Sequence, residues 1–145
     1  MTPREANFAP SWTLVFAAWL LATVATLGAL FMSEVMALAP CVLCWYQRIC
    51  MFPLVLLLAL GLFPFDPRVV RYALPLAVLG ALIALLHLLL MAGIVPEAAV
   101  PCRQGIPCKA AQITWLGFIT IPLLSLVAFC GIAALLTAAH FKSKT

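Results

Sequence analysis

Residues 72–95 read YALPLAVLGALIALLHLLLMAGIV, a stretch without a single Asp, Glu, Lys or Arg. A helix needs roughly 20 apolar residues to cross the hydrocarbon core of a bilayer, so this stretch predicts a transmembrane helix. In lipid the backbone must satisfy its own hydrogen bonds, which favours a helix over a strand. Three other stretches share this character, at 12–32, 45–63 and 113–134. We therefore expect an all-α integral membrane protein whose single domain, 1–145, is a four-transmembrane-helix bundle.

The composition of the whole chain supports a membrane protein. The sequence is 67% hydrophobic and 8% charged, with a mean hydropathy of +1.22. A soluble domain carries roughly 25% charged residues, so lipid must surround most of this chain. The formal net charge is +4, but the basic residues are scattered singly and form no run. The sequence therefore predicts a bilayer as the surroundings and excludes nucleic acid as a partner.

The distribution of basic residues predicts the orientation. The segment 33–44 holds no Lys or Arg, and the segment 96–112 holds two, Arg103 and Lys109. Five bases lie on the other side of the predicted spans. Loops rich in Lys and Arg stay in the cytoplasm, so we expect both termini there and the loops 33–44 and 96–112 outside. The five are Arg4, Arg68, Arg71, Lys142 and Lys144.

Two details of the apolar stretches bear on the helical assignment. The first stretch is too long for the apolar core of a signal peptide, and Arg4 is nearly balanced by Glu5, so we expect a retained helix. Pro53, Pro75 and Pro122 lie inside predicted helices. Membrane helices tolerate proline, so kinks rather than breaks are expected there.

Six cysteines divide into two groups by position. Cys50 and Cys130 lie within predicted helices, where a free cysteine packs as a small hydrophobe. The remaining four lie in or beside the two outer loops. Oxidising conditions outside the cytoplasm allow disulfides to form and persist. These four are Cys41, Cys44, Cys102 and Cys108.

Cys41 and Cys44 form a C-x-x-C pair that follows Pro40 and precedes a predicted helix. Proline suits the first turn of a helix, so the pair should lie at a helix N-terminus, where the dipole and free N–H groups stabilise a thiolate. Arg48 follows at the spacing i, i+3, i+7, which predicts one shared helix face. Its cation would lie about 6 Å below Cys44, near enough to stabilise a thiolate or to hold the carbonyl oxygen of an acceptor. A snorkelling Arg48 is the alternative.

Other functions for a C-x-x-C pair stay open at this point. A zinc site would need two more thiolates or histidines, for which Cys102 and Cys108 are available at an unusual spacing. Haem attachment would need a histidine where Trp45 stands. A structural disulfide would close too short a ring to add much stability. We favour redox chemistry and expect no bound metal.

The second pair, Cys102 and Cys108, lies in a polar loop of roughly 17 residues, longer than packing requires. Gly105 and Pro107 favour turns that let a short ring close. A soluble partner can reach this loop, whereas Cys41 and Cys44 lie nearer the membrane surface. The two pairs therefore suggest an entry and an exit for electrons.

His87 is a further candidate site residue, because it is an ionisable group inside a predicted span. The alternative is a structural histidine that is hydrogen-bonded to a neighbouring helix.

The run PCVLCWYQR at 40–48 resembles the signature of the bacterial disulfide-bond-formation membrane proteins, the DsbB family. The run WLGFITIP at 115–122 and the short ring 102–108 resemble its compact branch, called BdbC in some genomes. The resemblance covers nearly the whole chain. It implies a quinone-dependent thiol oxidase of the bacterial inner (cytoplasmic) membrane that reoxidises a soluble thioredoxin-fold oxidase of the DsbA or BdbD type. The membrane quinone would be ubiquinone or menaquinone.

The resemblance also implies a role for each site residue. The partner's thiolate would attack the Cys102–Cys108 disulfide, and freed Cys108 would attack Cys41. This would release Cys44 as a thiolate beside the quinone. Arg48 matches the quinone-positioning arginine of the family.

Two further points follow from the resemblance. His87 matches a third-helix histidine of compact members, which makes it a candidate for the cofactor site. Long members space the second cysteine pair far apart, whereas only five residues separate Cys102 from Cys108 here. The choice of the cysteine that takes the partner therefore stays open.

Two alternative functions belong to other classes. A quinone-coupled thiol enzyme of the vitamin K epoxide reductase type would carry its C-x-x-C on the last helix, where this chain has only Cys130. A non-enzymatic assembly or metal-handling factor would use the cysteines as staples or ligands. Bound metal would favour this second alternative, and bound quinone would count against it.

Overall fold

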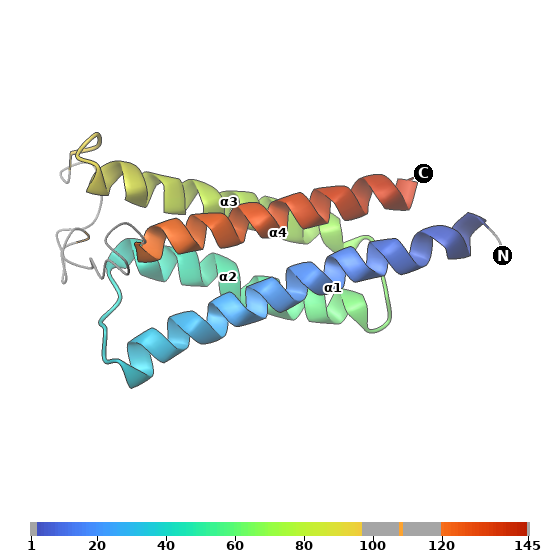
Figure 1. Cartoon of the computed structure of the whole chain (residues 1–145), viewed down its shortest axis with the longest axis horizontal. Coiled ribbons are helices and arrows are strands. Elements are labelled where there is room, and N and C mark those ends of the chain that lie inside the picture. Colours follow the sequence, from blue (N-terminus) through green and yellow to red (C-terminus); the bar gives the residue numbers. More distant parts are fainter. Residues whose placement is uncertain (1–2, 97–107, 109–119, 145) are drawn as a thin grey trace.

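The computed structural model describes residues 3–96, 108 and 120–144. Helix α1 (Pro3–Leu30) continues into a short π-helix, η1 (Phe31–Val35), and three further helices follow. The described residues contain no β-strand, so the predicted all-α fold class is confirmed (Figure 1). The three helices are α2 (Val42–Leu62), α3 (Val69–Met91) and α4 (Ile121–Lys144).

All four helices are long and apolar enough to cross a membrane. Large apolar side chains lie on the outside of the bundle, where lipid would cover them; Leu60 is 73% exposed and Leu56 is 66% exposed. Both ends of the described chain lie at one end of the bundle, and α2 begins at the opposite end (Figure 1). The termini therefore lie on the same side of the membrane, and the sidedness itself stays a prediction.

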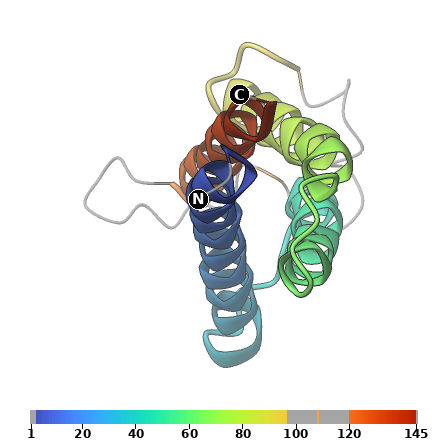
Figure 2. The ribbon, with the colours of Figure 1, turned by 90° about the vertical axis from the view of Figure 1, so that its right-hand side faces the viewer.

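The helices form a ring in which each packs against two neighbours (Figure 2). Helix α1 packs on α2 and α4, and α3 packs on the same two helices. Small residues at the contacts let the backbones approach closely, as in other membrane bundles. At Gly80 of α3 an added Cβ would collide with the ring of Phe129 from α4, which is completely buried. The alanines of the core are Ala18, Ala22, Ala73, Ala77, Ala84, Ala128 and Ala139.

Helix α1 diverges from the other three toward the end where α2 begins (Figures 1 and 2). There η1 widens the last turn, and Met36 N donates to the carbonyl oxygen of Phe31. The chain then reverses through Ala37, whose φ of 53° lies in the left-handed region. The divergence opens space between α1, α2 and α4.

The helix bounds differ from the apolar stretches. Hydropathy marks the residues that would contact lipid, whereas the backbone hydrogen bonds of a helix can continue beyond those residues. Helix α1 begins at Pro3 rather than 12, and α4 runs to Lys144 rather than 134. Helix α3 ends at Met91, before the predicted 95. Helix α4 begins at Ile121; the predicted start, 113–119, lies outside the described residues. Pro122 thus lies in the first turn, where proline leaves no hydrogen bond unmade, so the predicted kink there is wrong.

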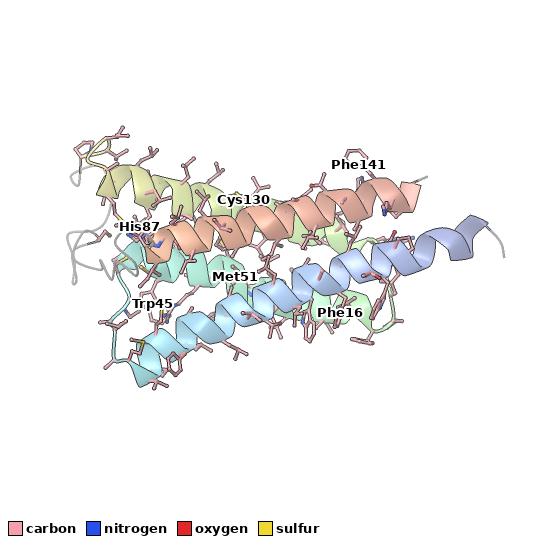
Figure 3. All side chains as sticks on the ribbon, viewed as in Figure 1. Phe16, Trp45, Met51, His87, Cys130 and Phe141 are labelled. Carbon is pink, nitrogen blue, oxygen red and sulfur yellow. The ribbon has the colours of Figure 1, made fainter. Side chains whose placement is uncertain are left out.

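The two helical cysteines differ in their surroundings. Cys50 is buried at 3% exposure in the core between the helices, as expected. Cys130 lies on the exposed surface of α4 (Figure 3), so its predicted packing role is wrong. A thiol on this surface faces lipid.

Candidate functional site

The first turn of α2 holds the C-x-x-C pair. Cys41 has extended backbone angles (φ −72°, ψ 170°) and is the N-cap, after Pro40. Its Sγ accepts a hydrogen bond of 3.3 Å from the backbone N–H of Cys44, as a serine or aspartate oxygen does at other N-caps. The two Sγ atoms lie 2.6 Å apart. Both sulfurs are therefore at a helix N-terminus, in position to form or break a bond with little movement.

The surroundings of Cys41 favour its thiolate. The hydrogen bond with the Cys44 thiol lowers the pKa of Cys41 well below its usual range, although burial works in the opposite direction. Hydrogen bonds from His87 and from the backbone N–H of Cys44 lower this pKa further. A thiolate is the nucleophile and the better leaving group in disulfide exchange. Cys41 is thus prepared for exchange at neutral pH.

His87 of α3 is fully buried and faces Cys41. Its Nε2 lies 3.9 Å from the Cys41 Sγ and 3.3 Å from the backbone oxygen of Cys108. A carbonyl oxygen only accepts, so Nε2 carries the hydrogen. The side-chain amide nitrogen of Gln47 lies 3.3 Å from Nδ1 and donates to it. Gln47 therefore orients the imidazole so that its N–H points toward Cys41 and Cys108.

Cys108 belongs to the same buried group as Cys41. Both are 1% exposed, and they pack with Leu43 and Leu90 in a small apolar cluster separate from the main core. Cys108 is disulfide-bonded, and its predicted partner, Cys102, lies outside the described residues. The structure therefore brings one cysteine of the second pair to the side of Cys41.

Cys44 faces a different space. A cavity of about 540 Å³ lies where α1 diverges, between α1, the segment 37–40, α2 and α4. Cys44, Gln47 and Arg48 contribute to its wall, whereas Cys41 and His87 do not. The remaining lining is mostly apolar, as in sites for small organic ligands. Trp45 and His87 mark this end of the bundle in Figure 3.

Arg48 is held in the wall of the cavity by α1. Its guanidinium donates 2.7 Å to the backbone oxygen of Ala29 and 3.2 Å to the hydroxyl of Ser33. It also lies 5.5 Å from the ring centroid of Trp45, a cation–π contact. Among the described residues these two hydrogen bonds use two of its five N–H donors. A positively charged group with donors to spare therefore borders an apolar cavity.

The prediction that Cys41, Cys44 and Arg48 share one helix face is wrong for Cys41. As the N-cap, Cys41 lies outside the helix, so the helical spacing does not apply to it. His87 lies next to Cys41 rather than in the cavity wall, and Gln47, which lines the cavity, contacts its Nδ1. Sequence reasoning missed Gln47 and Ser33. A buried amide inside an apolar span was the available signal for Gln47, while the contact of Ser33 needs the fold.

The chain is similar in sequence to known disulfide formation proteins. Residues 11–139 match the family model described as disulfide bond formation protein DsbB. A probable disulfide formation protein of Metapseudomonas resinovorans is 49% identical over 137 residues, covering 94% of each chain. Disulfide bond formation protein C of Bacillus subtilis (strain 168) is 47% identical over 115 residues, covering 79% of this chain and 83% of its own. No solved structure matches the chain significantly.

Proposed function

The chain belongs to the DsbB family of disulfide bond formation proteins, and on this premise we propose that it is a quinone-dependent thiol oxidase. Membership makes it a multi-pass membrane oxidoreductase that acts with a thiol–disulfide oxidase partner. The finer proposal is that a soluble DsbA- or BdbD-like oxidase of the thioredoxin fold delivers two electrons. They pass through Cys102–Cys108 and then Cys41–Cys44 to a membrane quinone, ubiquinone or menaquinone.

One observation carries the proposal: Cys41 and Cys44 face different surroundings across one helical turn. Cys41 lies in the buried cluster with Cys108, and Cys44 lies in the wall of the apolar cavity. An electron relay needs one sulfur that meets a thiol donor and one that meets an acceptor. In this arrangement Cys41 would meet the thiol donor and Cys44 would meet the acceptor, and the helix would not need to move.

The cavity residues fit a quinone. The wall is mostly apolar, as an acceptor taken from lipid requires, and its polar groups include the guanidinium of Arg48. The hydroxyl of Thr26 also lines the cavity, is buried, and has no hydrogen-bond partner in the described structure. Buried polar groups normally have a partner, so this hydroxyl is suited to a ligand oxygen. Arg48 and Thr26 would hold the ring oxygens, with Cys44 beside them.

The exchange step uses the residues of the chain as follows. The Cys108 thiolate attacks the Sγ of Cys41, a Cys41–Cys108 bond forms, the Cys41–Cys44 bond breaks, and the electron pair leaves on Cys44. The N–H of His87 points at the Cys41 sulfur and at the Cys108 backbone, which aligns the two. Arg48 stabilises negative charge in the cavity wall.

The second thiol of the partner then releases Cys102 as a thiolate and leaves the partner oxidised. The Cys102 thiolate attacks Cys108, which re-forms the Cys102–Cys108 bond, breaks the Cys41–Cys108 bond and frees Cys41 as a thiolate. A quinone held in the cavity would accept the two electrons of Cys41 and Cys44, whose disulfide then re-forms.

We also propose the location of the site. The excess of basic residues near the termini supports a cytoplasmic position for both ends. The start of α2 would then lie on the extracytoplasmic face of the bacterial inner membrane. A soluble oxidase outside the cytoplasm could reach it there.

The test is quinone reduction by the purified chain in detergent, followed by quinone absorbance after addition of a reduced DsbA-like oxidase. We expect turnover that is lost in Cys41→Ala and in Cys102→Ala. Cys130→Ser, on the lipid-facing surface, is the matched control and should turn over normally. A folded chain with both disulfides that reduces neither ubiquinone nor menaquinone would overturn the proposal.

A further inference from the structure

We propose that the reduced chain binds a soft divalent metal ion, Zn²⁺ or Cd²⁺, through Cys41, Cys44 and His87, and that the bound ion stops disulfide exchange. The ligand atoms of these three residues all lie within 4.8 Å of one another. They come from two helices that pack together, α2 with its cap and α3. The set of two thiolates and an imidazole is one that zinc sites use.

The distances are close to those of a tetrahedral site. Bonds of roughly 2.3 Å to sulfur and roughly 2.0 Å to nitrogen place a sulfur and a nitrogen ligand about 3.6 Å apart and two sulfurs about 3.8 Å apart. The Cys41 Sγ lies 3.9 Å from the His87 Nε2, which already fits. The two sulfurs lie 2.6 Å apart and must separate, which a rotation of the half-buried Cys44 side chain can provide.

A fourth donor is also in place. The backbone oxygen of Cys108 lies 3.3 Å from the Nε2 of His87, and two such donors of a tetrahedral zinc ion lie about 3.3 Å apart. This oxygen can bind the ion directly or hold a water molecule that does. The site would therefore be closed on the side of Cys108. An ion held there would block the approach of the Cys108 thiolate to Cys41.

Gln47 contacts the second ring nitrogen of His87, which in metal-bound histidines is normally hydrogen-bonded. Binding through Nε2 moves the ring hydrogen to Nδ1, which then donates to an acceptor. The amide of Gln47 lies 3.3 Å from Nδ1, and a half-turn of this amide presents its oxygen. The same residue thus serves both states of His87: it donates in the metal-free chain and accepts in the metal-bound chain.

Binding depends on the redox state. Both sulfurs must be free thiolates, and the ion displaces the remaining thiol protons, so the Cys41–Cys44 disulfide excludes it. Coordination to the ion withdraws electron density from both thiolates and so lowers their nucleophilicity toward a disulfide or an acceptor. Metal would therefore capture the chain after it has received electrons and before it has passed them on.

The experiment titrates the chain, reduced and freed of reductant, with Cd²⁺ alone, and records the thiolate-to-cadmium absorption. It needs neither a partner nor a quinone, so its result is independent of the proposed relay. We expect one ion per reduced chain, none per oxidised chain, and binding at least about tenfold weaker in His87→Ala and in Cys44→Ser. Cys50→Ser and Cys130→Ser, which change the free cysteines outside the cluster, should bind as the unchanged chain does.

Two further measurements cover a His87 variant that does not fold. X-ray absorption of the Zn²⁺-loaded unchanged chain should find two sulfur neighbours and at least one imidazole. Gln47→Leu should weaken binding about tenfold, and Gln47→Glu, which offers a carboxylate to Nδ1, should strengthen it. Equal binding by oxidised and reduced chains, a sulfur-only site, or Gln47 variants that bind alike would each overturn the proposal.

Discussion

Cys41 and Cys44 are three residues apart and both contact the buried cluster, yet only Cys44 of the two also lines the cavity. Cys41 is buried with Cys108, and its sulfur faces the N–H of His87. Cys44 is half-buried and borders an apolar cavity that Arg48 also lines. The difference arises because Cys41 caps the helix from outside while Cys44 belongs to its first turn. A single bond between these sulfurs would therefore connect the buried cluster with the apolar cavity.

The comparison suggests a general way to make a short disulfide directional. If both cysteines faced the same space, a donor and an acceptor would compete for it, and electrons could return to the donor. In the proposed relay, the buried cluster would receive a sulfur nucleophile and the cavity would receive a ligand from lipid. The separation needs only the change of backbone conformation at the N-cap.

The largest effect should come from removing each sulfur in turn. In Cys44→Ser, quinone reduction should fall to background, while the loop cysteines still exchange once with a reduced partner, because only the acceptor side is lost. In Cys41→Ser the Cys41–Cys44 disulfide is also lost, so in both variants Cys108 has no disulfide to attack and the relay stops after the first exchange. Quinone absorbance should show no reduction by either variant, and a thiol count of the partner after a single mixing should show one exchange per chain for both. Normal turnover by Cys44→Ser would mean that Cys44 is not needed to pass electrons to the acceptor, and that the two cysteines do not have different roles.

Removing the charge from the cavity should have the next largest effect. Arg48→Ala should raise the KM for quinone about 10- to 100-fold, since a hydrogen bond to a charged group contributes about 1.5–3 kcal/mol. The affinity for the partner should stay within about twofold. Steady-state kinetics with each substrate varied separately measure both quantities. Ser33→Ala, which removes one anchor of the guanidinium, is the milder control, and equal losses for quinone and partner would indicate a folding role for Arg48.

The pH dependence of the reactivity of Cys41 tests the surroundings of this cysteine in the buried cluster. His87 helps to lower the pKa of Cys41, so His87→Gln should raise it, and each pKa unit lowers the thiolate fraction about tenfold at a pH below both values. Alkylation of Cys41 in the reduced chain should therefore be about tenfold slower at a pH below the Cys41 pKa of about 4. At alkaline pH Cys41 is ionised in both the unchanged chain and His87→Gln, so their alkylation rates should converge. Mass spectrometry of the Cys41 peptide can follow these rates. Equal alkylation rates of the unchanged chain and His87→Gln at every pH would show that His87 does not lower the pKa of Cys41.

The smallest effect concerns Thr26. Thr26→Val keeps the shape of the side chain and removes a buried hydroxyl without a partner, so the ligand-free chain should gain up to about 1 kcal/mol of unfolding free energy. If the hydroxyl serves a ligand, the KM for quinone should rise about fivefold at the same time. Thermal unfolding in detergent and the kinetic assay measure the two changes. A stability gain with an unchanged KM would show that the hydroxyl has no part in binding.

Much of the fold could be predicted from the sequence because a bilayer allows few structures. The four apolar stretches permit little except four helices, and the number of helices and the fold class are confirmed. Their ends could not be predicted as well. Helix α4 continues past the apolar residues to Lys144, because a helix can continue beyond the residues that lipid requires to be apolar. The divergence of α1, which makes the cavity, left no pattern in the sequence that we recognised.

The site could be predicted only as far as local spacing reaches. Pro40 and the C-x-x-C pair predicted a helix N-terminus, and α2 begins there. The contacts of His87 with Gln47 and Cys41 join residues 40 or more positions apart, so they depend on how α3 packs on α2. The roles of the four redox cysteines stay predictions.

The placement of the chain ends has a practical consequence. Both ends of the described chain lie at the end of the bundle away from the start of α2, where Cys41 and Cys44 lie (Figure 1). A membrane-spanning helix of about 20 residues is roughly 30 Å long, and this length separates the two ends of the bundle. A fluorescent protein or affinity tag fused at either end should therefore leave the two cysteines accessible to the proposed partner. The same two positions suit reporters that would reveal on which side of the membrane the chain begins and ends.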